Sequence, residues 1–319
     1  MTNASMINGK AYEFACLSRL KDVVSKIRPV TVIDNSSYHV AKGCWDSLIE
    51  SKQTDLAISA EAGVKALISL EPKIVEDGTD MLELSLQEDS RGESGDVRDI
   101  LVVRKPIDWE IGISVKNNHH ALKHSRLSKK LDFGQKWLNI PCSNDYFQEI
   151  KPHFEELKKL HDSKVCWRDL DGKHEKYYIP VLDAFMKELR RQYEVGGEVV
   201  ANSFARYLLG SFDFYKLISN PSRHSTSLIS FNLYGTLGKA SKSLQPEHEV
   251  PLVELPNRIF NIGLKPNSTD TVEVHMDNGW EITLRIHSAS SIVESSLKFD
   301  VQITGMPQSL FVIDTPWRI

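Results

Sequence analysis

The sequence predicts an α/β protein in which residues 1–210 combine helices and strands and residues 211–319 are mainly β-strand. Three observations support this fold class. Apolar residues recur at helical spacing through the first third of the chain. The segments 81–87 and 98–116 alternate apolar and polar residues, as half-buried strands do. After Gly210, short β-like runs are separated by Gly, Pro, Asn and Ser.

The helices are predicted from the spacing of apolar residues. The first predicted helix covers residues 8–27, with apolar residues on one face and Asn8 as its N-cap. The pair Gly196-Gly197 is expected to separate two later helices, because glycine is unfavourable inside a helix. The other predicted helices cover residues 40–51, 54–70, 145–162, 180–194 and 198–209.

The strands are predicted from alternation and from turn residues. A hairpin is expected with strands at 98–104 and 109–116 and with Pro106 in its turn. Asn278-Gly279 marks another hairpin, since this pair accepts the positive φ angles of tight turns. The change of character near Gly210 is either a domain boundary or a change of layer within one fold. The other β-like runs lie at 30–36, 81–87, 226–238, 258–266, 271–287 and 296–305.

The composition is that of a globular protein. Of 319 residues, 41% are hydrophobic and 26% are charged, and no apolar stretch is long enough to span a bilayer. The first ten residues lack the pattern of a secretory signal. The four cysteines are scattered without metal-binding spacing, which favours reduced thiols and a cytoplasmic protein.

Charge is distributed unevenly on either side of the predicted hairpin. Residues 71–99 contain ten acidic and three basic residues, a net charge of −7. Residues 101–140 contain eight basic and three acidic residues, a net charge of +5. Such blocks are often solvated surface. They are also what metal-dependent chemistry on a polyanion requires, with carboxylates for the cation and basic groups for phosphates.

The predicted hairpin brings an acid and an amine together. With the turn at 105–108, Asp99 lies opposite about position 115, so that Ser114 and Lys116 flank it. Glu110, Ser114 and Lys116 share one face, and alternate apolar residues fill the other. Phosphodiester hydrolysis needs a cation held by carboxylates and a positioned cationic group, and this face offers both.

These residues resemble a known signature. An Asp at the start of one strand, followed on the next by (D/E)-X-K, is typical of the PD-(D/E)XK nucleases, and Asp99 with Ser114-Val115-Lys116 is similar to it. Longer segments resemble the HaeIII family of type II restriction endonucleases, and they span nearly the whole chain. They include KAYEFACLSRLK, VRDILVVR, WEIGISVKNNHHALKHSRLS, LDFGQKW, FDFYKLIS, FNLYGTLG and DNGW.

The resemblance implies a mixed central sheet flanked by helices, with residues 211–319 contributing to DNA recognition. It further implies an endonuclease that uses Mg²⁺, with Mn²⁺ as an alternative, and cuts double-stranded DNA at GGCC to leave blunt ends. A cognate DNA methyltransferase is the expected functional partner, without a need for physical contact. The symmetry of the target favours a homodimer, with a monomer as the alternative.

One position departs from the signature. Ser114 stands where a carboxylate is expected, and a hydroxyl is a poor ligand for a hard cation. Glu13 in the first helix and Glu110 on the hairpin are equally ranked replacements, although Glu110 is four residues from Ser114, about 13 Å along a strand. Asp96 is the third candidate. The departure also keeps open an inactive DNA-binding protein on the same fold, and a DNA-repair nuclease is a further alternative.

Polar residues after the hairpin and in the later strands are candidates for DNA contact. Arginine suits guanine N7 and O6, which are acceptors in the major groove. A metal site formed by His119, His120 and His124 is disfavoured, because neither Cys nor an acid completes the set. The DNA-binding candidates are Asn117, Asn118, His124, Ser125, Arg126, Lys129, Arg223 and Arg285.

Overall fold

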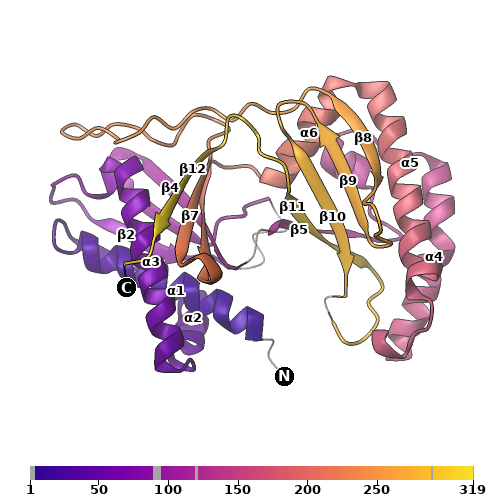
Figure 1. The fold of residues 1–319 in the computed structure, drawn as a ribbon, viewed down its shortest axis with the longest axis horizontal. Coiled ribbons are helices and arrows are strands. Elements are labelled where there is room, and N and C mark those ends of the chain that lie inside the picture. The colour runs from indigo at the N-terminus through magenta and orange to yellow at the C-terminus, as the bar shows by residue number, and fades with distance from the viewer. Residues whose placement is uncertain (1–3, 89–94, 119–120, 289, 319) are drawn as a thin grey trace. The chain divides into compact units, whose positions relative to one another are not determined.

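The computed structural model describes residues 4–88, 95–118, 121–288 and 290–318 and divides into two compact units (Figure 1). Each unit is assembled from segments that are distant in sequence. Unit 1 consists of Met1–His120, Ser211–Val253 and Ser309–Ile319, and unit 2 consists of Ala121–Gly210 and Glu254–Gln308.

Unit 1 is built on a seven-stranded mixed sheet with the order β1-β2-β3-β4-β6-β7-β12. Strands β2, β3 and β4 form an antiparallel meander, and β6 lies parallel to β4 after a long crossover. The strands are β1 (Val30–Val32), β2 (Leu82–Leu86), β3 (Ile100–Arg104), β4 (Trp109–Asn117), β6 (Phe214–Asn220), β7 (Ser225–Phe231) and β12 (Phe311–Pro316).

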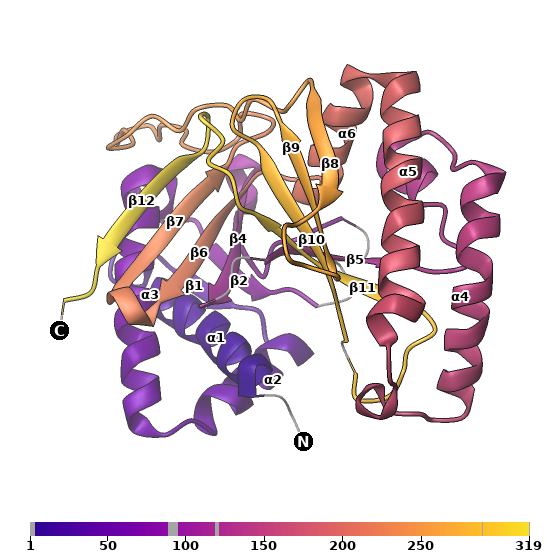
Figure 2. The same cartoon turned by 45° about the vertical axis from the view of Figure 1, so that its right-hand side comes forward.

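Helices cover one face of this sheet. Helix α1 (Ala4–Val24) packs on β4, and α3 (Glu50–Leu70) packs on β6, β7 and β12 (Figure 2). Helix α2 (Ser36–Asp46) packs against α1. Strands β2 and β3 bury alternate residues, so their apolar side chains join those of the helices in one core. The placement of α1 brings its middle turns to the central strand.

Unit 2 is built on a five-stranded antiparallel sheet with the order β5-β11-β10-β9-β8. Helices α5 (Ile179–Gly196) and α6 (Glu198–Leu209) pack on it, and α4 (Asn144–Asp162) packs on α5. An aromatic cluster that includes Phe133, Phe185 and Phe299 fills the space between helices and sheet. The strands are β5 (Ala121–Leu127), β8 (Ile259–Leu264), β9 (Thr271–Met276), β10 (Glu281–His287) and β11 (Leu297–Ile303).

Most predicted elements are confirmed, with shifted ends. The hairpin and the helices near 145–162, 180–194 and 198–209 are present, and Gly197 separates the last two with a φ of 49°. Asn8 lies inside α1 instead of capping it. The second helix starts at Ser36, earlier than predicted, because the Asn35 side chain caps it by accepting from the Tyr38 N–H.

Three strands were not predicted, for different physical reasons. All seven residues of β6 are buried, so this strand shows no alternation. The basic segment of β5 was interpreted as a connector. Strand β12 lies at the sheet edge, where its six residues are only partly buried or exposed. The division of the structure therefore differs from the predicted parts 1–210 and 211–319. Gly210 does end a segment, but 211–253 pairs with the N-terminal part through β4 and β6.

Within the described ranges, the helices are too short or too polar to cross a lipid bilayer.

Candidate active site

The candidate site is organised around the carboxylate of Asp99, which directly precedes β3. Its Oδ2 accepts three hydrogen bonds from β4: from the Val115 N–H at 2.6 Å, Lys116 Nζ at 3.0 Å and Ser114 Oγ at 3.1 Å. The Lys116 contact is also an ion pair between partly exposed groups. One oxygen of Asp99 is thus held by three donors, while Oδ1 accepts no hydrogen bond from a described residue.

The backbone of Asp99 is fixed on both sides. Its N–H donates to the Ile113 carbonyl at 2.8 Å, and its carbonyl accepts from the Gln87 N–H at 2.9 Å. The register pairs Ile100 with Ile113, which projects Asp99 opposite Ser114. The sequence placed it opposite about position 115, so that expectation was one residue off, although Asp99, Ser114 and Lys116 do meet.

Glu13 is brought to the same place by the packing of α1 on β4. Its side chain is buried and accepts from Lys10 Nζ at 3.0 Å. Burial, followed by the negative charge of Asp99, raises the pKa of Glu13 to about 8, although Lys10 and Lys116 act in the opposite direction. Two carboxylates and two ammonium groups are therefore close enough to influence one another.

The other two candidate ligands are engaged elsewhere. Asp96 accepts from Arg98 Nε at 2.7 Å and from Arg98 Nη2 at 2.8 Å, and Glu110 accepts from Arg98 Nη1 at 2.6 Å. Burial raises the pKa of Asp96, but hydrogen bonds from Arg98 and Gln87 outweigh it and leave the pKa below its usual value. Both acids are thus ion-paired with the same arginine, and no contact joins either to Asp99 among the described residues.

Arg98 also explains the glycine in the middle of β4. A Cβ built on Gly112 would lie 1.9 Å from Cδ of Arg98, so the arginine side chain crosses the strand where Gly112 has no side chain. The guanidinium lies 4.0 Å from the centroid of the Phe212 ring. Arg98 therefore ties the segment before Asp99 to the face of β4.

Ser114 is only 2% exposed, and its hydroxyl donates to Asp99. In this arrangement it is a hydrogen-bond donor that positions the carboxylate. The donor set that fits a hard cation is the pair of carboxylates of Asp99 and Glu13. Among the described residues there is no group of three or more His, Cys, Asp or Glu that could hold a metal ion. A pair can still suffice for Mg²⁺, which commonly binds one or two carboxylates and completes its shell with water and substrate phosphate.

Comparison with known proteins assigns the family. The model of the HaeIII restriction endonuclease family matches residues 9–307. The chain is 44% identical to the type II restriction enzyme HaeIII of Haemophilus aegyptius over 318 residues, which covers 100% of both chains. The chain belongs to the HaeIII restriction endonuclease family. No solved structure matches it.

The DNA-binding candidates of this HaeIII-family chain that lie in unit 1 are found after β4 and β6. Asn117 ends β4, and its buried Oδ1 has no hydrogen-bond partner among the described residues. Asn118 is exposed, with a φ of 51°, and its N–H donates to the Ser219 carbonyl at 2.9 Å. Arg223 is exposed in a 3₁₀ turn, Pro221–Arg223, between β6 and β7.

The remaining candidates lie in unit 2. Arg126 is exposed on β5 and donates to Glu294 and Ser296, each at 3.0 Å. Arg285 is exposed on β10, and Lys129 pairs with Glu155. Ser125 is 2% exposed and donates to Tyr207 Oη at 3.4 Å, which indicates a packing position instead of a DNA contact.

The histidines of this region are only partly described. His119 and His120 lie outside the described residues. His124 belongs to β5 and pairs with Asp300 through the backbone, but its side chain is not described.

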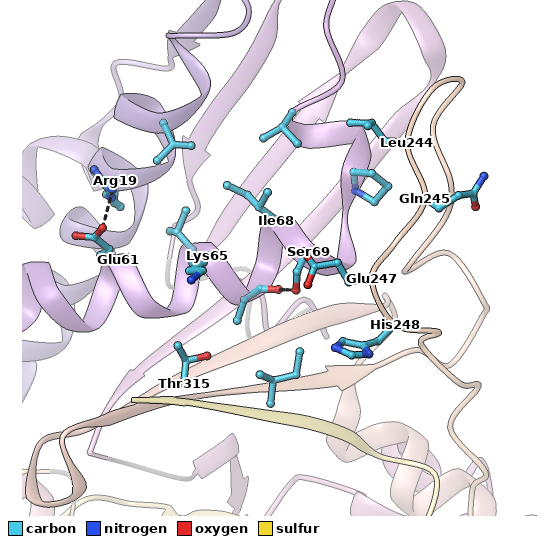
Figure 3. Close-up of a pocket in the computed structure, with 16 residues that line it drawn as sticks. Arg19, Glu61, Lys65, Ile68, Ser69, Leu244, Gln245, Glu247, His248 and Thr315 are labelled. Atoms are coloured by element: carbon cyan, nitrogen blue, oxygen red, sulfur yellow. Dashed lines mark hydrogen bonds and ion pairs between the residues drawn. The ribbon is translucent and has the colours of Figure 1, made fainter. Parts of the chain in front are cut away.

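A pocket of about 580 Å³ lies elsewhere in unit 1 (Figure 3). It is lined by residues of α1, α3, β12 and the segment 244–248, and it contains the Arg19–Glu61 ion pair at 3.0 Å. None of the site residues predicted from the sequence lines it. The candidate site around Asp99 is therefore identified by its hydrogen bonds and ion pairs and not by a cavity.

Sequence reasoning missed two contributors to the site. Lys10 lies one helical turn before Glu13, and this spacing could have indicated the pair. Gly112 interrupts the β-branched residues of β4, and a glycine inside a strand often marks the close approach of another group.

Replacing Gly112 with Ala tests the crossing of Arg98 over β4. The added methyl group overlaps Arg98, so we expect a loss of about 1–3 kcal/mol in the free energy of unfolding, measured by urea denaturation. Gly43→Ala in α2 is the matched control, because a Cβ there would meet no described atom within 4 Å other than those of its chain neighbours and of the backbone of its own helix. This control should be neutral or stabilising by about 0.5–1 kcal/mol. Equal stability of Gly112→Ala and wild type would contradict the crossing.

Replacing Glu13 with Gln tests the burial of this acid. In the folded protein the pKa of Glu13 is about 8, compared with the ordinary value of 4.5. Wild-type stability should therefore fall as the pH rises from 4.5 to 8, whereas the Gln variant should not show this loss. In EDTA we expect the variant to gain on the order of 3 kcal/mol over wild type between pH 5 and pH 8. A difference that does not change with pH would show that Glu13 is not buried in this way.

Proposed function

We propose that this chain is a type II restriction endonuclease that hydrolyses double-stranded DNA at GGCC and leaves blunt ends. The observation that carries the proposal is the meeting of Asp99, Lys116 and Glu13 in a full-length member of the HaeIII family. Membership of the family narrows the activity to that of a restriction endonuclease, and the cluster supplies groups suited to phosphodiester hydrolysis. A DNA-repair nuclease is disfavoured, because the similarity to HaeIII extends over the whole chain.

The fold supports a PD-(D/E)XK core as part of this proposal. Asp99 precedes β3, Lys116 lies near the end of β4, and the two strands are antiparallel neighbours at the centre of a mixed sheet. The carboxylate missing at Ser114 is supplied in the proposal by Glu13 from α1. Glu110 and Asp96 are less suitable, because both already form ion pairs with Arg98.

Asp99 and Glu13 are the residues that would hold Mg²⁺, with Mn²⁺ as an alternative. A divalent cation supplies Lewis acidity to the phosphate and lowers the pKa of a bound water. The donors fit such an ion: two carboxylates lie near each other, and the raised pKa of Glu13 reflects burial and then repulsion from Asp99, which Lys10 and Lys116 relieve only in part.

The residues of the chain have separate tasks in this scheme. Ser114 and the Val115 N–H donate to Oδ2 of Asp99, which fixes the orientation of the carboxylate and therefore of Oδ1. The Lys116 ammonium lies beside Asp99 and is placed to orient the attacking water and to stabilise the negative charge that develops on the phosphate. Lys10 donates to Glu13 and restrains its carboxylate. The water oxygen forms a bond to phosphorus while one bridging P–O bond breaks.

The palindromic target also bears on assembly. A two-fold dimer would give each DNA strand one copy of the site, and we propose a homodimer on this ground. A DNA methyltransferase of the same specificity is the expected functional partner, because host DNA needs protection at the same sequence.

Cleavage of a plasmid with several GGCC sites tests the function. With Mg²⁺ we expect discrete fragments that end at those sites, and methylation of the sites should abolish them. Fragments that end at other sequences would show a different specificity. Binding without cleavage in both Mg²⁺ and Mn²⁺ would favour the inactive DNA-binding protein.

Substitutions at the carboxylates and the lysine test the residue roles in the same assay. Asp99→Asn, Lys116→Gln and Glu13→Gln should each lower the single-turnover cleavage rate by roughly 100-fold or more while duplex binding persists. Glu110→Gln is the matched control and should cut within about tenfold of wild type, because it lacks contact with the cluster. If Glu13→Gln cuts normally and Glu110→Gln does not, the assignment of the second ligand is wrong.

A further inference from the structure

The sheet of unit 2 has one apolar and one polar face. In β10, Leu284 and Ile286 are buried, whereas the alternate residues Arg285 and His287 are exposed or half-buried. In β11, Phe299 is buried among the aromatic residues and Lys298 is partly exposed, whereas Asp300 on the polar face is buried. Because α5 and α6 pack against the apolar side chains, the charged side chains project from the opposite face.

Three basic residues lie in one row across this polar face. The register places Lys298 of β11 directly opposite Arg126 of β5 on one side and His287 of β10 on the other. Side chains at directly opposite positions are about 5 Å apart, and like charges there are destabilising. Glu294 offsets part of the charge through an ion pair with Arg126 at 3.0 Å.

Lys298 is the least compensated member of the row. Its ammonium makes no hydrogen bond or ion pair with any described residue. Burial, followed by the charge of Arg126, lowers the pKa of Lys298, although the carboxylates of Glu294 and Asp300 act in the opposite direction. Burial, followed by the charge of Lys298, likewise lowers the pKa of His287. A partly desolvated cation beside another cation lowers the stability of the fold.

The neighbouring row adds a fourth donor. Arg285 lies opposite Asp300, and its Nη2 is 3.5 Å from Asp300 Oδ2. Asp300 is only 3% exposed, whereas the Arg285 side chain is 54% exposed. Gln302 also donates to Asp300, at 3.1 Å. The buried carboxylate thus restrains an arginine whose remaining N–H groups face outward.

We infer that this polar face binds the DNA backbone, with Lys298 contacting a phosphate between Arg126 and His287 and with Arg285 as an additional phosphate donor. The inference rests on the proposed function, which supplies duplex DNA as the polyanion. A phosphate between Lys298 and Arg126 converts their repulsion into two charge-assisted hydrogen bonds, and release of counterions from DNA favours the contact. These contacts are independent of base sequence.

The test measures equilibrium binding of the full chain to two duplexes that differ only in the presence of GGCC, without divalent metal so that cleavage does not interfere. Lys298→Gln should weaken binding to both duplexes by a similar factor, roughly 3- to 10-fold, and should lower the slope of log K against log[salt] by about one. Lys298→Arg should restore the wild-type slope.

Lys187→Gln is the matched control. Lys187 lies on α5 of the same unit, is 65% exposed and pairs with Glu149, so its loss changes the net charge equally without touching the polar face. The salt slope of this variant should equal that of wild type. Lys298→Gln should also raise the melting temperature of the DNA-free protein, because it removes a poorly compensated cation. A merely structural lysine would lower it.

Three outcomes overturn the inference. An unchanged salt slope in Lys298→Gln would exclude the phosphate contact. Weakened binding to the GGCC duplex alone would indicate base recognition instead. Wild-type protein that neither binds nor cuts GGCC DNA would overturn the proposed function and the inference with it, whereas normal cutting by wild type with an unchanged variant slope overturns the inference alone.

Discussion

One carboxylate oxygen organises the candidate active site. Oδ2 of Asp99 accepts from the backbone of Val115 and from the side chains of Ser114 and Lys116, so the entry to β3 and the end of β4 cannot separate without breaking three hydrogen bonds. Because both strands lie inside the seven-stranded sheet, this geometry is supported on either side. The packing of α1 on β4 then delivers Glu13 to a position that is already fixed.

The acids near the hairpin differ in how their charge is balanced. Arg98 forms ion pairs with both Asp96 and Glu110 and stacks on Phe212, so these contacts stabilise the hairpin. Glu13 is desolvated beside Asp99, and Lys10 compensates it only in part, which is why its pKa is raised. Acids whose charge is balanced by ion pairs stabilise the fold. A buried acid that lowers the stability of the fold is instead a candidate ligand-binding residue.

The sequence predicted what depends on neighbours along the chain and missed what depends on tertiary packing. Asp99 and Lys116 belong to one hairpin, so alternation and a turn residue were enough to bring them together. Choosing between Glu13 and Glu110 required knowledge of where α1 packs on β4. Arg98 reaches Glu110 only because Gly112 has no side chain, and this contact could not be predicted from the sequence. The interleaving of the two units likewise follows from the pairing of β4 with β6, strands that are about a hundred residues apart.

Local charge density is therefore a poor guide to function in this chain. The acidic block before the hairpin contains Glu76 and Asp80, and both form ion pairs with Arg104. The informative residues are those whose charge the fold leaves poorly compensated, Glu13 in unit 1 and Lys298 in unit 2. In each, burial and a neighbour of like charge move the pKa toward the neutral form. In the proposed scheme a ligand of opposite charge relieves each of these costs, a cation at Glu13 and a phosphate at Lys298.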